Sequence, residues 1–401
     1  MSQVVIVGAG PIGATMALLL SKKGIAVKLV EASRDFKRLF RGEGLMPSGL
    51  DALEQMDLLG LLAEVPHRAI DAWEFLLSGR TLFRVDEPIE KNGKHYTTVV
   101  SQPHLLAAII EQAETYPQFE FIQGEPVGDL LFSSDRVSGV KLASGQEITA
   151  DLVIAGDGRN SVIRKKAGLK LTKLQNNLDI LWFKLDSGVF AKSANIFYSI
   201  LQGREGFGLF RASSGQFHIG WGLHADDNYD WQQVDWGEKL AATSPPWLAE
   251  HIVKHRESLT KPMLLSVVVG RCDRWSIPGL LLLGDAVHPM SPIRAQGINM
   301  AFRDVIVAVN HLVPLLTQSS ADLSKIDAAL PQIQLEREPE IIRIQKLQAQ
   351  EIAQAELLHN YAFLRWGAKT FAPIIRPGIR ASWLRRQKQL RQGVTKVCLV
   401  V

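Results

Sequence analysis

The sequence predicts an α/β protein in which a parallel-sheet domain is interrupted by an antiparallel sheet and followed by a helical C-terminal region. Three short apolar runs, Val4–Val7, 152–155 and 280–283, each lead into a glycine-containing turn and a helix start. A run that is apolar on both faces is typical of a buried parallel strand. We assign 1–72, 101–168 and 271–320 to the parallel-sheet domain, 73–100 and 169–270 to the antiparallel sheet, and 321–401 to the helical region.

The composition of the chain indicates an ordinary globular protein. It has 401 residues, of which 46% are hydrophobic and 21% charged, and its net charge of +4 gives no support for a nucleic-acid partner. Cys272 and Cys398 form no Cys-x-x-Cys pair, which is typical of a reducing compartment, so we expect a cytoplasmic location. The most apolar helix-like run, Ile298–Leu316, contains Arg303 and Asp304, so we expect no membrane span.

The C-terminal region carries an excess of positive charge. Between Arg376 and Lys396 there are seven basic residues and no acidic one. Such a segment can bind an anionic partner such as a membrane surface, or it can be the solvated face of a helix whose other face buries Trp383 and Leu390. We favour the second interpretation, so membrane contact is possible but not expected. The last residues, Val394–Val401, are predicted to form a short strand.

The N-terminal motif predicts a dinucleotide site. Gly8, Gly10 and Gly13 follow the first strand and open a helix, and Glu31 ends a second strand, 18 residues after Gly13. Gly8 allows a tight turn, Gly10 lets the backbone approach a pyrophosphate, and Gly13 lets helix and strand pack closely. The helix N-terminus favours the phosphates, and the acid can accept a hydrogen bond from a ribose hydroxyl.

Two later motifs repeat the order of strand, Gly-Asp turn and helix. Asp157 ends one strand, and Gly284-Asp285 ends another, which continues through Pro292 to Asn299. Alone, each is an ordinary β-turn-α joint. An aspartate at such a strand end can bind a ribityl hydroxyl, and a helix N-terminus near Gly297 can stabilise negative charge on a reduced flavin.

Together the three motifs, which span residues 4 to 304, resemble the single-component flavoprotein aromatic hydroxylases, the family of para-hydroxybenzoate hydroxylase and the ubiquinone-pathway hydroxylases. The resemblance implies a Rossmann-like domain that binds FAD, with NADPH or NADH as a transient co-substrate. It also implies O2-dependent hydroxylation of an aromatic or quinol-like small molecule through a flavin C4a-hydroperoxide. The cofactor-binding positions that it implies are Gly8, Gly10, Ile12, Gly13, Glu31, Ala32, Arg41, Gln102, Val127, Asp157, Gly284, Asp285, Pro292, Ala295, Gln296, Gly297, Ile298 and Asn299.

The sequence departs from the family in one motif. The usual pattern is Pro-x-x-Gly-Gln-Gly, and here Ala295 replaces the first glycine, with Arg294 placing a cation beside it. This departure puts the mobility of the flavin ring in question more than FAD binding. A second Gly-x-Gly-x-x-Gly unit is not found, which fits transient docking of the nicotinamide cofactor.

The substrate site is expected on the antiparallel sheet, with Trp182, Phe210, Arg211, Trp221 and Pro292 as pocket candidates. Arg211 and His218 are weak candidates for a catalytic base, which stays unassigned, and we expect no metal site. Two alternatives stay open: a flavin-dependent reductase or halogenase-like enzyme of the same fold, and a non-catalytic prenyl-binding chaperone. Substrate identity, the choice between NADH and NADPH, and the oligomeric state are not determined by the sequence.

Overall fold

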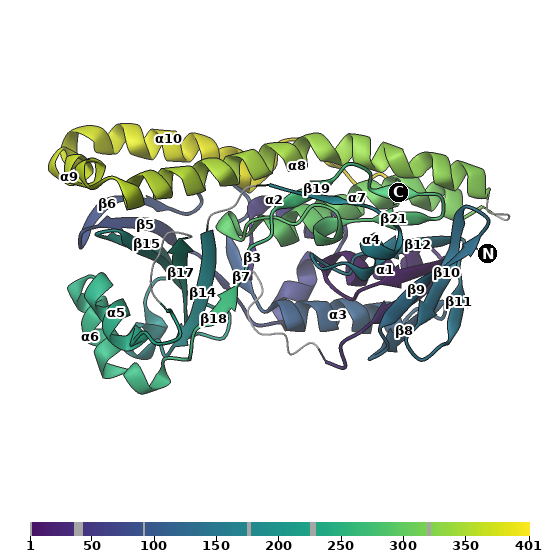
Figure 1. Cartoon of the computed structure of the whole chain (residues 1–401), viewed down its shortest axis with the longest axis horizontal. Helices are drawn as coiled ribbons and strands as arrows, with labels where there is room; N and C mark the ends of the chain where they lie inside the picture. The colour runs from purple at the N-terminus through teal and green to yellow at the C-terminus, as the bar shows by residue number, and fades with distance from the viewer. Residues whose placement is uncertain (1, 36–42, 91–92, 175–177, 225–229, 319–321) are drawn as a thin grey trace.

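The computed structural model describes every residue except 1, 36–42, 91–92, 175–177, 225–229 and 319–321. Two sheet-containing bodies lie beside each other, and the long C-terminal helices run along one side of both (Figure 1). The predicted position Arg41 falls outside the described residues.

The first body is built on a six-stranded sheet in the order β20-β21-β12-β1-β2-β8. All pairs except β20–β21 are parallel, which confirms the Rossmann-like fold. Every residue from Val4 to Ile6 is fully buried, as the unbroken apolar pattern predicts. The strands are β1 (Gln3–Val7), β2 (Ala26–Glu31), β8 (Phe119–Gln123), β12 (Leu152–Ala155), β20 (Ser276–Ile277) and β21 (Leu280–Leu282).

Helices α1 (Pro11–Lys22) and α7 (Gln296–Leu316) pack against each other in the same hydrophobic core as this sheet. Pro11 begins α1, where its missing N–H costs nothing. The segment Ile293–Leu316 is long and apolar enough to cross a membrane, but 78% of its most apolar window is buried inside the protein, as in a core helix.

Smaller elements complete the first body. A three-stranded antiparallel sheet joins β9 (Val127–Ser133), β10 (Arg136–Leu142) and β11 (Glu147–Thr149), and a second joins β3 (Gly44–Leu45), β7 (Thr98–Val100) and β4 (His67–Ala69). The remaining helices here are α2 (Pro47–Gln55), η1 (Leu59–Glu64), α3 (Gln102–Glu114), α4 (Val162–Lys166), η4 (Gly284–Ala286) and η5 (Ile293–Ala295). A two-stranded link, β13 (Leu171–Lys173) with β19 (Gly270–Cys272), leads to and from the second body.

The second body is a seven-stranded sheet in the order β18-β14-β17-β16-β15-β5-β6. One face packs on α5 (Trp236–Thr243) and α6 (Pro246–Lys254) through an apolar cluster that includes Phe183 and Leu209. The other face, around Trp73 and Phe83, packs in a cluster with Met46 and Val99 of the first body and Trp383 of the C-terminal region. The strands are β5 (Ala72–Leu77), β6 (Arg80–Asp86), β14 (Leu178–Leu185), β15 (Ile196–Gln202), β16 (Glu205–Arg211), β17 (Phe217–His224) and β18 (Met263–Leu265); the short helices are η2 (Gly188–Lys192) and η3 (Arg256–Ser258).

The C-terminal region is helical, as predicted, with α8 (Leu323–Asn360), α9 (Ala362–Thr370) and α10 (Ala372–Gln392). The strand predicted at Val394–Val401 is wrong, because this segment forms no ladder with a neighbouring strand. Side chains bind its backbone N–H groups instead: Glu340 accepts from Val394 at 2.6 Å, and Asn310 accepts from Val400 at 2.9 Å.

Candidate active site

The carboxyl ends of the parallel strands meet at the glycine loop, residues 8–13. Gly8 donates its N–H to Val30 O at the end of β2 (2.7 Å), and Gly156 donates to Val7 O at the end of β1 (2.9 Å). Leu283 donates to Ala155 O (3.0 Å), which brings the Gly284-Asp285 turn to the same edge. The three sequence motifs are therefore neighbours in space, at the edge where open α/β sheets bind ligands.

Each glycine of the loop meets a different steric limit. Gly8 has φ +94°, and a Cβ on Gly13 would lie 1.8 Å from Gly8 O, so neither position admits a side chain. A Cβ on Gly10 would meet only Gly156 O, at 3.9 Å. The space above Gly10 is therefore left free for a ligand. The Ile12 side chain packs on the other side of the loop, next to Gly284.

Glu31 ties the glycine loop to the next turn. Its carboxylate accepts hydrogen bonds from Ala9 N (2.7 Å) and Ser33 N (2.9 Å), and its carbonyl accepts one from Gly124 N (2.8 Å). The segment that leads into Val127 thus lies beside Glu31, with Ala32 exposed at the rim. Gln102, the first residue of α3, is buried in the same body.

Asp157 has one satisfied and one unsatisfied oxygen. Oδ2 accepts hydrogen bonds from Val162 N (2.8 Å) and Ile163 N (3.1 Å) at the start of α4. Oδ1 is buried and has no hydrogen-bond partner among the described residues, and burial raises the pKa of this carboxyl. A buried oxygen without a partner is costly, so this atom fits a ligand hydroxyl.

Asp285 is exposed at the end of β21, and Gly297 lies close to its carboxylate. The turn beneath it is held by a buried carboxylate: Asp304 accepts hydrogen bonds from Gly284 N (3.2 Å) and His288 Nε2 (2.7 Å). Arg337 Nε donates to the other oxygen of Asp304 at 2.8 Å. This network fixes the turn and leaves the Asp285 carboxylate facing outward.

The 292–299 loop approaches the same edge at the N-terminus of α7, and Pro292 begins its 3-10 turn. Arg294 and Ala295 both adopt left-handed backbone conformations, with φ of 60° and 50°. Ala295 therefore keeps a conformation that suits the glycine of the family pattern. Asn299 donates to Gly44 O (3.1 Å) and accepts from Met46 N (2.8 Å), which joins the loop to β3, and Ile298 packs in the core.

Gln296 is fully buried at the first position of α7. Its Nε2 donates to Arg294 O (2.7 Å), while its Oε1 has no hydrogen-bond partner among the described residues. Gly297, the next residue, has no side chain to fill the space beside Gln296. With Asp157 Oδ1 and the space above Gly10, this gives two buried oxygens without a partner and one open backbone surface. These features fit the ribityl, pyrimidine and pyrophosphate groups of FAD.

Arg294 is held in an aromatic cage between the two bodies. Its guanidinium lies 5.3 Å from the Trp73 ring, 5.7 Å from Phe75 and 5.5 Å from Trp383. Its Nη2 also donates to Glu351 of α8 at 2.8 Å. The 292–299 loop is thereby fastened to β5, α8 and α10 at once.

The sheet face opposite the 292–299 loop is aromatic. The rings of Trp182 and Phe210 meet edge-on at 6.5 Å, and Phe210 stacks on Phe197 at 5.5 Å. Gly220 and Gly208 lie under the Trp182 and Phe197 rings, where a Cβ would come within 3.2 Å of each ring. Two of the predicted pocket residues, Trp182 and Phe210, therefore share this face.

The other two sheet residues named as pocket candidates lie elsewhere, and we do not retain them. Trp221 is 1% exposed and packs edge-on against Trp236 of α5, because alternate residues of a strand point to opposite faces. Arg211 is 2% exposed, and its guanidinium donates to backbone carbonyls that include Phe190 O at 2.6 Å. Its role is to hold the η2 segment.

A polar group lies beside the aromatic face, and of its members only His218 was a candidate from the sequence. His218 and Lys184 are cross-strand neighbours on β17 and β14, and Glu43 reaches toward them from the first body, with its carboxylate 3.5 Å from Ser213 N. Burial, opposed by Ser213 and Lys184, raises the pKa of Glu43 to about 7, and burial with Lys184 lowers the pKa of His218 to about 4. A partly buried glutamate with a pKa near neutrality beside an aromatic face is a candidate acid or base.

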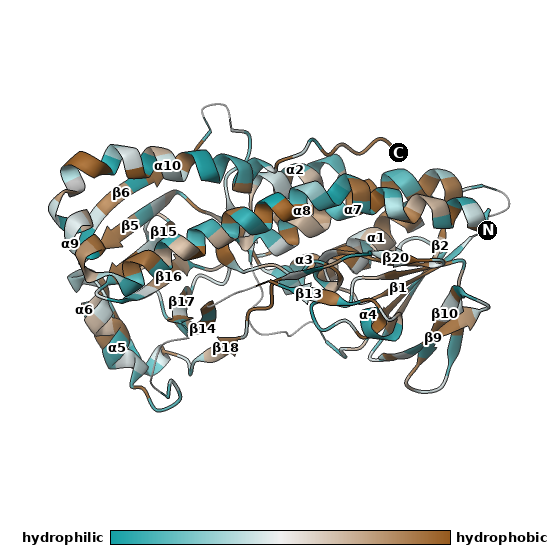
Figure 2. Cartoon of the chain, turned by 45° about the horizontal axis from the view of Figure 1, so that its top comes forward, coloured by the Kyte–Doolittle hydropathy of each residue, from teal (hydrophilic) through white to brown (hydrophobic). Residues whose placement is uncertain are grey.

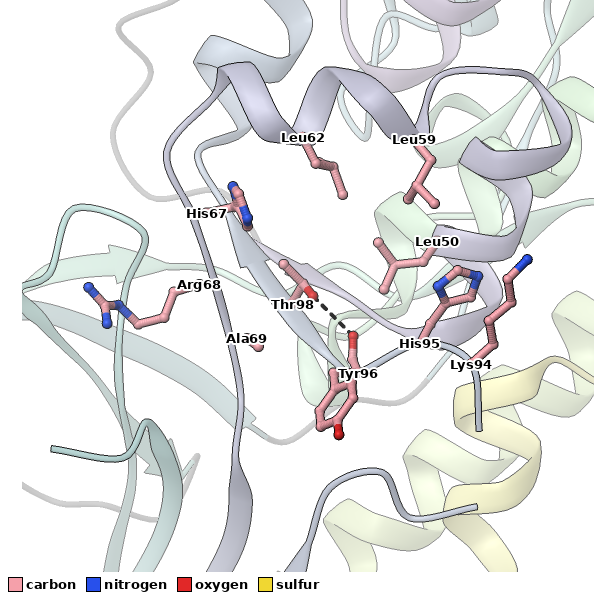
Figure 3. A pocket seen from close by; sticks show the side chains of 10 residues that line it. All are labelled: Leu50, Leu59, Leu62, His67, Arg68, Ala69, Lys94, His95, Tyr96 and Thr98. Carbon is pink, nitrogen blue, oxygen red and sulfur yellow. Dashed lines mark hydrogen bonds between the residues drawn. The ribbon is translucent and has the colours of Figure 1, made fainter. Parts of the chain in front are cut away.

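A separate cavity of about 510 Å³ opens between α2, η1, β4 and β7 (Figure 3). Leu50, Leu59 and Leu62 form its apolar side, and Lys94 and His95 lie at its edge. Lys94 forms an ion pair with Glu54, and His95 Nε2 lies 3.2 Å from the same carboxylate, so the positive charge of Lys94 is offset at this edge. None of the residues predicted as a site lines this cavity.

Comparison with known proteins agrees with this geometry. A family model described as "FAD binding domain" matches residues 1–329. The 6-methylpretetramide 4-monooxygenase of Streptomyces rimosus is 31% identical over 362 residues, covering 87% of this chain and 83% of that protein. The p-hydroxybenzoate hydroxylase of Acinetobacter baylyi is 25% identical, covering 80% and 79%.

The 3-demethoxyubiquinol 3-hydroxylase of Escherichia coli is 24% identical, covering 78% of this chain and 80% of that protein. Among solved structures, Pseudomonas aeruginosa PqsL in complex with 2-aminobenzoylacetate has the same fold, with a TM-score of 0.77, 20% identity, and coverage of 90% of this chain and 97% of that one. The chain therefore belongs to the FAD-binding-domain family and is an enzyme of the FAD-dependent aromatic monooxygenase type.

Proposed function

We propose that this enzyme uses NADH or NADPH and O2 to hydroxylate an aromatic or quinol-like small molecule. The observation that carries the proposal is the aromatic sheet face with Trp182 and Phe210, which lies opposite the 292–299 loop. Relatives that act on 6-methylpretetramide, 3-demethoxyubiquinol and p-hydroxybenzoate support the same substrate class.

The FAD-binding residues divide by the part of the cofactor that each would hold. Gly10 would face the pyrophosphate, in a loop whose shape Gly8 and Gly13 maintain, and Glu31 would bind the adenosine ribose. Asp157 and Asp285 would bind hydroxyl groups of the ribityl chain. Gln296 and Gly297, at the N-terminus of α7, would stabilise negative charge at the pyrimidine end of the ring. Bound flavin supplies the redox chemistry by passing electrons from the nicotinamide to O2.

The protein's own contribution to the reaction is substrate placement and proton handling. The ring faces of Trp182 and Phe210 offer a flat apolar surface for an aromatic substrate. Glu43, with a pKa of about 7, can accept the proton of a ring hydroxyl, which makes the ring more electron-rich. His218 stays neutral at pH 7, because burial and Lys184 lower its pKa, so it can act as a hydrogen-bond partner without adding charge.

One assay tests the proposal against its rivals. The purified protein is examined for the flavin spectrum, and then NADH, NADPH and O2 consumption are followed with a library of phenols, aminoaromatics and quinols. Coupled consumption with a gain of one oxygen atom in the product supports hydroxylation. Nicotinamide oxidation that does not depend on O2 indicates a reductase, a halide requirement indicates a halogenase, and a protein without flavin that binds prenyl lipids indicates a chaperone.

A matched pair of glycine variants separates cofactor contact from folding. Gly10→Ala is expected to leave the melting temperature of the FAD-free protein unchanged, because the new Cβ would meet only Gly156 O at 3.9 Å. FAD should bind roughly tenfold more weakly, about 1.4 kcal/mol, because the methyl group occupies the pyrophosphate's approach. Gly13→Ala should lower the melting temperature itself, since its Cβ would lie 1.8 Å from Gly8 O. Equal FAD affinity in Gly10→Ala and wild type would place the pyrophosphate elsewhere.

A second pair tests the attachment of the 292–299 loop. Arg294→Met removes the cation from the aromatic cage and is expected to lower the free energy of unfolding by about 2 kcal/mol and to alter the visible spectrum of bound FAD. Arg386→Met is the control, because Arg386 binds the same Glu351 (2.6 Å) from α10 without contacting the loop. Urea unfolding and flavin absorption spectra are the measurements. If both variants change the flavin spectrum to the same extent, the position of the 292–299 loop does not depend on Arg294.

A further inference from the structure

The turn between the last helices exposes a group of large apolar side chains. This helical tip comprises the end of α8, all of α9 and the start of α10, and it lies at the far end of the helical layer, beyond the second body's sheet (Figure 1). Trp366 is 63% exposed, Phe363 66% and Ile374 77%. Leu357, Tyr361 and Phe371 are also between 47% and 49% exposed.

These side chains belong to none of the hydrophobic core clusters, and four of them form two contacting ring pairs. Tyr361 and Phe363 have ring centroids 5.7 Å apart, and Trp366 and Phe371 meet edge-on at 6.0 Å. No other element among the described residues covers these rings, and the apolar positions of α9 and early α10 stand out as brown bands at the outer end of the helices in Figure 2. Exposed apolar groups of this kind mark interaction sites.

The charge around the helical tip has one sign. From Leu357 to Arg380, the part of the chain that forms the tip, there are four Lys and Arg residues and no Asp or Glu. Lys369, Arg376 and Arg380 are exposed next to the aromatic side chains. Farther along α10, Trp383 and Leu390 are buried, as the sequence predicted, and the basic residues there include Arg386 and Arg391, which form ion pairs with Glu351 and Glu87. The tip therefore carries unburied positive charge of its own.

We propose that the helical tip docks on the surface of an anionic phospholipid bilayer. Trp and Tyr side chains favour the boundary between lipid headgroups and acyl chains, and Phe, Leu and Ile add apolar area that inserts beside them. Lys and Arg next to them are attracted by the negative surface of the bilayer. The favoured occupant is a membrane and not a second copy of this chain, because two copies of so basic a surface would repel each other.

The test uses the full-length, FAD-loaded protein in vesicle sedimentation. Phosphatidylcholine vesicles with and without phosphatidylglycerol are compared at low and high NaCl. The apolar variant is Phe363→Ser with Trp366→Ser, and the charge variant is Lys369→Glu with Arg376→Glu. Val253→Ser is the matched control, since Val253 is equally exposed (67%) but lies on α6 in the other helical layer.

Wild type and Val253→Ser are expected to sediment with anionic vesicles and to be released at high salt. Both tip variants should lose about tenfold or more of this partitioning, while melting temperature and flavin content stay as in wild type. If the apolar variant fails to fold, the charge variant and the salt dependence still decide the outcome. Wild-type protein that stays in the supernatant overturns the proposal, as does a dimer in light scattering that only the tip variants convert to monomer.

Discussion

Glu43→Gln is expected to lower kcat for hydroxylation by about 10²–10⁴-fold, the range for removal of a general acid or base. The amide keeps the size of the side chain and its contact with Ser213, but it cannot accept a proton. FAD affinity should not change, because the described residues that surround the glycine loop do not include Glu43. Stopped-flow and steady-state kinetics measure the effect, with a substrate that the wild-type enzyme hydroxylates.

The pH dependence of Glu43→Gln distinguishes a catalytic role from a structural one. Because burial raises the pKa of Glu43 to about 7, the base form accumulates only above that pH, and wild-type kcat/KM should rise as pH passes through 7. The variant should lose this rise. Glu54→Gln is the control, since Glu54 is an exposed carboxylate paired with Lys94 and should leave the profile unchanged. An identical profile in Glu43→Gln and wild type would remove Glu43 from the mechanism.

The Glu43 carboxyl group is also expected to lower the free energy of unfolding at high pH. The folded state holds the Glu43 proton up to about pH 7, whereas the unfolded state releases it near 4.5. Stability attributable to Glu43 therefore falls as pH rises from 4.5 to 7, and the full cost is present above 7. Glu43→Gln removes that cost, so we expect its free energy of unfolding at pH 8 to exceed that of wild type by about 1–3 kcal/mol. Urea titrations at pH 5 and 8 check the sign.

Glu340→Ala is expected to lower the free energy of unfolding by about 3–5 kcal/mol, because it leaves buried cations without a partner. Glu340 is fully buried on α8, accepts hydrogen bonds from Arg303 Nε (3.0 Å) and Nη2 (2.9 Å), and pairs with Arg337. It also accepts from Val394 N at 2.6 Å, so α7, α8 and the C-terminal segment all depend on it. Equilibrium denaturation measures the loss.

The pH dependence of this network has the opposite sign. Burial alone would raise the pKa of Glu340, but Arg337 and Arg303 outweigh it and lower the pKa to about 2. The stability that Glu340 contributes is therefore complete above pH 4.5 and is lost as pH falls from 4.5 toward 2. Glu336→Ala is the control, since Glu336 is half exposed and lies 3.0 Å from His311, and it should change stability by less than about 1 kcal/mol. A similar loss in both variants would contradict the buried-network account.

The fold class and the family followed from the sequence. The three strand-turn motifs are local, and each glycine or aspartate acts through backbone geometry within a few residues of itself. For that reason Gly8, Gly13 and Asp157 could be assigned to a nucleotide-binding edge before any contact was known. The roles of the individual cofactor-binding positions remain predictions, and Arg41 lies outside the described residues.

Other features of the active site were decided by the tertiary structure. Trp182 and Trp221 have similar surroundings in the sequence, but alternation along paired strands sends Trp182 to the face opposite the 292–299 loop and Trp221 to the helix-covered face. Both faces are apolar, so the sequence pattern cannot say which one meets the other body. The choice depends on how the two bodies pack.

The sequence by itself determined where a dinucleotide can bind, because a turn that only glycine can adopt is encoded within a few residues. Only the tertiary structure placed Glu43 near Lys184, which is more than a hundred residues away in the chain, and enclosed Arg294 among rings from two other elements. The pKa of a carboxyl group and the position of a cation depend on burial and on distant neighbours, and these exist only after the chain has folded.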